Sequence, residues 1–138
     1  MIAIWKSAVA VCCAITAAAT VAGCAGEYAS QDSGQCNINV GGSVLKVAAE
    51  KQFAYREAAH AACHGRVEAL LSLLLFTEQT DGEAMLDHAN VLRTLRQHLG
   101  AHRFDKVSRS LGTERQRNVD ALIRTAEKLH QATPQISG

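Results

Sequence analysis

The chain has 138 residues, of which 48% are hydrophobic and 4% aromatic, and its formal net charge is +1. This length and apolar content suit one globular domain and exclude a disordered chain, while a charge near zero gives no support for nucleic-acid binding. Alanine and leucine are abundant and Pro134 is the only proline, so the composition favours helices.

The N-terminal segment has the three-part pattern of a secretory signal. A stub with one cation, MIAIWK, precedes an uncharged stretch over residues 7–23 that ends in small residues. An uncleaved membrane anchor is the alternative. It is disfavoured because the stretch is alanine-rich and close to the lower length limit of roughly 17 residues for a membrane span.

The uncharged stretch leads into Val21-Ala22-Gly23-Cys24. This tetrapeptide resembles the lipobox of bacterial lipoproteins, in which an aliphatic residue and two small residues precede the cysteine that receives the lipid. The resemblance covers the first 24 residues. It implies cleavage after Gly23, a covalent lipid with palmitate-type acyl chains on Cys24, and attachment to a cell-envelope membrane. In a Gram-negative source, Ala25 in place of Asp favours the outer membrane, facing the periplasm.

Three segments are therefore expected. Residues 1–23 form a cleaved signal peptide, residues 24–42 carry the lipidated cysteine and a flexible tether rich in Gly, Ser, Gln and Asn, and residues 43–138 form a helical domain.

The helical domain shows apolar residues at helical spacing. Residues 43–79 contain one glycine and no proline, which predicts a single long helix. A second stripe over 85–99 stops at Gly100, a short helix follows up to Gly112, and a third stripe covers 119–129. Two capping-box patterns, Thr80 to Glu83 and Thr113 to Gln116, are typical of helix starts. The fold class is thus all-α, a small three- or four-helix up-and-down bundle.

Two cysteines, Cys36 and Cys63, remain for pairing once the signal is removed and Cys24 is lipidated. In an oxidising compartment we expect them to form a disulfide. An unbroken helix from Ser43 conflicts with this, because it places Cys63 about 30 Å from Ser43 while the chain from Cys36 to Ser43 reaches only about 25 Å. We therefore expect the bridge together with a later helix start, between residues 48 and 52.

Two histidine pairs have i, i+4 spacing, His60 with His64 and His98 with His102. Such pairs hold transition metals when adjacent turns aim ring nitrogens at one ion, and Glu78 or Glu83 would complete the shell. Gly100 is expected to break the second pair. The alternative is that His60 is a half-buried core residue and that the other histidines lie on the surface.

The sequence carries no enzyme signature, so no catalytic residue and no cofactor other than the lipid is expected. The expected function is binding of another envelope protein. Accessory or piloting subunits of secretion or conjugation systems, exclusion factors and envelope stabilisers are such proteins. The alternative is a periplasmic metal-binding or metal-sensing protein that uses the paired histidines.

The lipobox generates a direct test. The Cys24→Ser variant should remain unacylated and leave the membrane fraction, because the lipid supplies the attachment and the net charge does not. Fractionation and metabolic labelling with a fatty acid check this. A Cys24→Ser protein that stayed membrane-bound would point to the uncleaved anchor instead.

Overall fold

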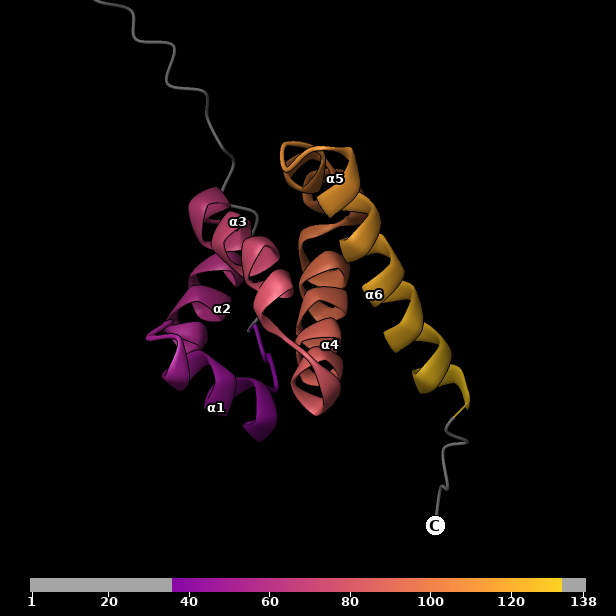
Figure 1. Ribbon diagram of the computed structural model, residues 1–138. Helices are drawn as coiled ribbons and strands as arrows, with labels where there is room; N and C mark the ends of the chain where they lie inside the picture. The colour runs from indigo at the N-terminus through magenta and orange to yellow at the C-terminus, as the bar shows by residue number, and fades with distance from the viewer. Residues whose placement is uncertain (1–35, 133–138) are drawn as a thin grey trace, which may run out of the picture. The chain divides into compact units, whose positions relative to one another are not determined.

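Figure 1 shows the computed structural model of the protein, which describes residues 36–132. These residues form 6 α-helices and one short 3₁₀ helix, with no strand among them, so the predicted all-α bundle is confirmed. The predicted signal peptide and Cys24 lie outside the described residues. None of the helices in residues 36–132 combines the length and apolar character needed to cross a bilayer. The elements are α1 (Gly42–Glu50), α2 (Tyr55–Cys63), α3 (Val67–Phe76), η1 (Thr77–Gln79), α4 (Gly82–Leu99), α5 (Ala101–Arg109) and α6 (Thr113–Ala132).

Helix α4 lies at the centre of the bundle. It contacts α1 and α2 on one side and α5 and α6 on the other, with α6 running alongside it (Figure 1). Its inward face is almost wholly apolar, with one polar exception, His88. The stripe predicted over residues 85–99 supplies Ala89, Leu92 and Leu95 to this face, and Val91, outside that stripe, is also fully buried.

The single helix predicted over residues 43–79 is wrong, because two turns divide it into α1, α2 and α3. At the first turn Gln52 adopts a left-handed conformation (φ 55°), and the Phe53 amide donates to the Ala48 carbonyl at 2.8 Å. At the second turn Gly65 has φ 80°, and Arg103 of α5 donates to its carbonyl at 2.9 Å. These turns let the three short helices fold back on one another and explain why the bundle has more helices than predicted.

The predicted start of the first helix between residues 48 and 52 is also wrong, since α1 begins at Gly42. Its first turn is capped by a residue of another helix. The Asp87 carboxylate of α4 accepts hydrogen bonds from the amides of Ser43 (3.1 Å) and Val44 (3.3 Å). A Cβ at Gly41 would collide with this carboxylate, so a larger residue there would displace Asp87 from the cap.

The expected disulfide between Cys36 and Cys63 is present, with 6.1 Å between the two Cα atoms. The reach conflict disappears because α2 returns toward the start of the domain after the first turn. The bridge closes a sequence separation of 27 residues, which contributes about 3–4 kcal/mol in the chain-entropy model. It also fixes the end of the segment predicted as a tether, since Cys36, Ile38 and Val40 pack partly buried against the core.

The C-terminal half follows the predicted pattern closely. Helix α4 ends at Leu99, and Gly100 (φ 84°) separates it from α5. The predicted capping box at Thr80 is wrong: its hydroxyl donates to the Thr77 carbonyl at 3.0 Å, and Asp81 occupies the N-cap position of α4. Helix α6 begins at Thr113, so the residue predicted as its N-cap is instead its first helical residue.

Candidate functional site

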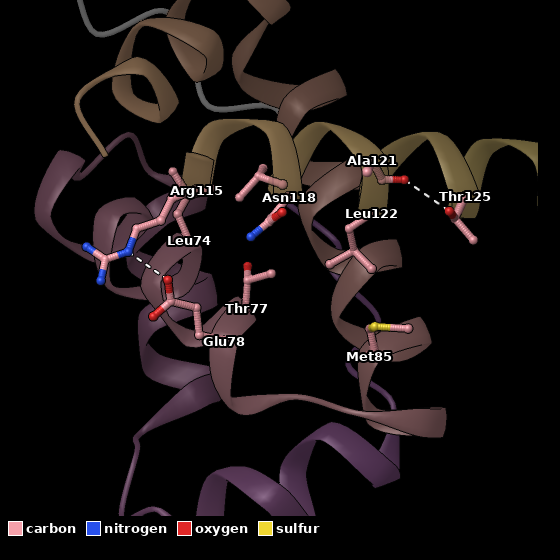
Figure 2. Close-up of a pocket in the computed structure, with 10 residues that line it drawn as sticks. Leu74, Thr77, Glu78, Met85, Arg115, Asn118, Ala121, Leu122 and Thr125 are labelled. Carbon is pink, nitrogen blue, oxygen red and sulfur yellow. Dashed lines mark hydrogen bonds and ion pairs between the residues drawn. The ribbon is translucent and has the colours of Figure 1, made fainter. Parts of the chain in front are cut away.

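A groove of about 360 Å³ lies between α6 and the connection from α3 to α4 (Figure 2). Apolar side chains from three helices line it: Leu74 of α3, Met85 of α4, and Val119, Ala121 and Leu122 of α6. Leu74, Val119 and Leu122 are buried and also belong to the core, whereas Met85 remains 38% exposed. The groove is therefore an apolar surface supported directly by the packed interior.

Polar groups mark the edges of the groove. The Arg115 guanidinium donates from Nε to the Glu78 carboxylate at 2.7 Å and so joins α6 to η1 at one end. Figure 2 shows Thr77 and Asn118 pointing toward one another from opposite sides. The Thr125 hydroxyl bonds to the Ala121 carbonyl of its own helix at 3.0 Å. An apolar floor with a polar rim is the pattern of protein recognition surfaces.

Thr77 connects the groove to a buried imidazole. His88 of α4 has no exposed surface, and its two ring nitrogens lie 2.6 Å from the Tyr55 hydroxyl and 3.0 Å from the Thr77 hydroxyl. A neutral imidazole has one N–H and one acceptor nitrogen, so both hydroxyls are satisfied in either tautomer. The chain of hydrogen bonds joins α2, α4 and η1 in the interior beneath the groove.

Aromatic rings surround this imidazole. Phe76 and Tyr55 pack edge-on against His88, with ring centroids 5.8 and 5.7 Å from its own, and Phe53 stacks on Phe76 at 4.7 Å. Burial in this apolar setting disfavours the charged ring and lowers the pKa of His88 to about 4. A hydrogen bond with the Leu73 backbone raises the pKa, but its effect is smaller than that of burial. Burial, reinforced by the nearby Asp87 charge, also raises the pKa of Tyr55. Both groups are therefore neutral at neutral pH.

His88 was not among the histidines that the sequence singled out. The expectation of a core histidine was attached to His60, which is exposed. The available signal was the position of His88 on the apolar stripe of α4, one residue before Ala89 and four before Leu92. Its partners are 33 and 11 residues away in sequence, so spacing alone could not identify them.

The first predicted histidine pair is brought together. His60 Nε2 and His64 Nε2 lie 3.2 Å apart on exposed positions, with ring centroids separated by 4.5 Å. The acidic residues expected to complete a metal shell lie elsewhere: Glu78 pairs with Arg115, and Glu83 accepts a hydrogen bond from Ser43. Within residues 36–132 no third Cys, His, Asp or Glu ligand atom joins this pair.

The second predicted pair lies on two helices. His98 belongs to the last turn of α4 and His102 to the first turn of α5, on either side of Gly100. His98 instead approaches the disulfide: a ring nitrogen of His98 and the sulfur atoms of Cys36 and Cys63 all lie within 4.8 Å of one another.

Comparison with known proteins gave no match: no protein-family model, no curated protein and no solved structure matches the chain.

The buried imidazole predicts a pH-dependent stability. Between pH of about 6.5 and about 4 the unfolded chain binds a proton at residue 88 that the folded chain excludes, so the free energy of unfolding falls as the pH falls, by on the order of 3 kcal/mol at full effect. Urea unfolding across this pH range measures it. The His88→Gln variant should be less stable at pH 7 and should lose this part of the pH dependence.

The exposed His130 supplies the matched control. The His130→Gln variant should keep the wild-type slope of stability against pH. Equal slopes for wild-type protein and His88→Gln would show that the imidazole of His88 is not held neutral by the fold.

Proposed function

We propose that the protein is a lipid-anchored envelope lipoprotein whose helical domain binds a partner protein, with an apolar helix face of the partner seated in the groove. The observation that carries this proposal is the groove itself, where α6 and the α3–α4 connection leave an apolar floor open between them. The resemblance of residues 21–24 to a lipobox supports the anchoring.

A partner helix suits the groove because of the way its lining is arranged. Val119 and Leu122 are three residues apart on α6 and line the groove together with Leu74 and Met85. In helix-in-groove recognition, the partner helix inserts apolar anchors at i, i+3 and i+4 between helices of the receptor, and an apolar lining of this kind accommodates them. The Glu78–Arg115 ion pair at one end gives a polar boundary that fixes the length of the apolar contact.

The groove is also held in a defined shape before any partner binds. Thr77 at its edge is bonded to the fully buried His88, and the ion pair ties η1 to α6. A surface that is already ordered loses less conformational entropy on binding, which raises its affinity. Accessory and piloting subunits, exclusion factors and envelope stabilisers all require a surface of this kind.

A second function, metal binding, is favoured by the pair of His60 and His64. Their Nε2 atoms are 3.2 Å apart, whereas two nitrogens bound at about 2.0–2.1 Å to one tetrahedral Zn²⁺ are separated by about 3.3–3.4 Å. The pair is therefore close to the geometry of a two-histidine chelate on an exposed helix face, with water in the remaining coordination positions.

The groove is tested by site-specific photo-crosslinking in cells. A photoreactive residue in place of Met85 should give a discrete adduct with one envelope protein. The same residue in place of Leu75, which is equally exposed at 38% but does not line the groove, should give none. Gel mobility and mass spectrometry of the adduct provide the measurement.

An Ala121→Glu change in the Met85-labelled protein supplies the second arm. Ala121 is exposed and lines the groove, so a carboxylate there should reduce the adduct by about tenfold or more through the cost of desolvating it against a partner. Equal adduct yields from positions 85 and 75, or an adduct yield that Ala121→Glu leaves unchanged, would contradict the proposal that the groove binds the partner.

The histidine pair is tested by titrating the oxidised protein with Zn²⁺, Cu²⁺ and Ni²⁺ in a calorimeter. Micromolar or tighter binding is expected, weakened by about tenfold or more in His60→Ala and in His64→Ala because each change removes a direct ligand. The His130→Ala protein should bind as the wild type does. Absence of binding, or binding that survives both changes, would remove the metal function.

A further inference from the structure

Three side chains of types that bind metals meet at the Cys36–Cys63 disulfide. Cys36 precedes α1, Cys63 ends α2, and His98 lies in the last turn of α4. One ligand atom from each, two sulfurs and a ring nitrogen, fit within 4.8 Å of one another. Neither the groove nor the His60–His64 pair uses these atoms in this combination.

The disulfide and a metal ion compete for the same two sulfur atoms. While the bond between Cys36 and Cys63 is intact, neither sulfur is a thiolate. Thiolate and imidazole together form a donor set typical of Zn²⁺, which is bound by sulfur at about 2.3 Å and by histidine nitrogen at about 2.0–2.1 Å. We propose that reduction of the disulfide converts Cys36, Cys63 and His98 into a Zn²⁺ site.

The geometry requires little movement of the backbone. Two thiolates on one tetrahedral Zn²⁺ have sulfurs about 3.8 Å apart, a separation that rotation of the two cysteine side chains provides once the covalent bond is broken. The cysteine Cα atoms are 6.1 Å apart. His98 is exposed on its helix end, so its ring is free to turn toward the ion.

Access to the site comes from the side of Cys36. This half-buried residue lines a cavity of about 430 Å³ together with Val40, Arg56 and His60. Cys63, by contrast, is buried. A reductant or an ion therefore approaches through this cavity and reaches Cys36 first. Because the three side chains supply three ligands, water occupies the fourth coordination position of the ion.

The chemical steps balance with a dithiol as the reductant. The dithiol loses two hydrogens and closes its own disulfide, while the Cys36–Cys63 bond breaks and each sulfur gains one hydrogen. Zn²⁺ then replaces the two thiol protons, which pass to solvent, and neutral His98 donates a ring-nitrogen lone pair. The segment around Cys36 thus stays attached to α2 in both states, and in the metal state α2 is also linked to the end of α4.

The test uses full-length protein purified in detergent, reduced with a dithiol and freed of it under anaerobic conditions, and titrated with Co²⁺ as a spectroscopic substitute for Zn²⁺. Reduced wild-type protein should develop thiolate-to-cobalt charge-transfer absorption that Zn²⁺ abolishes. Oxidised protein should show none. A Cys36→Ser, Cys63→Ser double variant sets the background from all other thiols.

Substitutions at His98 and His102 identify the third ligand. His98→Gln should weaken by about tenfold or more the Co²⁺ binding that the thiolate-to-cobalt absorption reports. His102→Gln and the His60→Ala, His64→Ala double variant should leave the titration of that absorption as in the wild type. Equal affinity of the His98→Gln and His102→Gln proteins would overturn the proposal, as would absorption no stronger than that of the double-serine background.

If reduction unfolds the domain, circular dichroism measures the loss and recovery of its helicity. A reduced protein that has lost helicity should regain it on adding Zn²⁺, because the metal restores the link between the segment at Cys36 and α2. Failure of Zn²⁺ to restore helicity counts against the site. These readouts are independent of crosslinking at Met85, so the outcome here leaves the groove proposal separately testable.

Discussion

The domain depends on one buried imidazole, that of His88. A ring with two polar nitrogens is tolerated in a dry interior only when both nitrogens are bonded, and here the hydroxyls of Tyr55 and Thr77 satisfy them from α2 and η1. Other arrangements of α2, α4 and η1 would leave at least one of these polar groups buried without a partner. The hydrogen bonds therefore select one way of packing these elements, which the apolar contacts alone would specify less strictly.

The groove follows from that constraint. Thr77, which lines the groove, is hydrogen-bonded to the buried His88, and this contact fixes the η1 turn on one side of the groove. On the opposite side α6 is held by its own contacts with α4 and α5. The apolar floor of the groove thus lies between η1 and α6, each of which is held by contacts with the rest of the domain.

The sequence predicted what depends on local periodicity. The stripes that became α4 and α6, the short helix α5 and the break at Gly100 could be identified because each buries one face and a glycine stops the pattern. The disulfide was predictable because the lipobox resemblance left Cys36 and Cys63 as the two cysteines available for pairing. The groove was not, since its lining comes from three helices whose mutual placement no local pattern contains.

The errors share a physical cause, which is that the deciding contacts lie far apart in sequence. Gln52 turns the chain without being a glycine, proline or asparagine, so no turn signal marked the end of α1. The capping partner of α1 belongs to α4. The core histidine was assigned to His60 because its spacing fitted a helix that the chain does not continue through. In each case tertiary packing overrode a locally reasonable pattern.

The cap supplied by Asp87 also sets an order of assembly. Helix α1 has 9 residues, too few to persist as an isolated helix in water, and the carboxylate that completes its first turn lies 44 residues further along the chain from Ser43. During synthesis, α1 therefore cannot be completed before the first half of α4 has been made and folded. The part of the described domain that is made first is among the last to be finished.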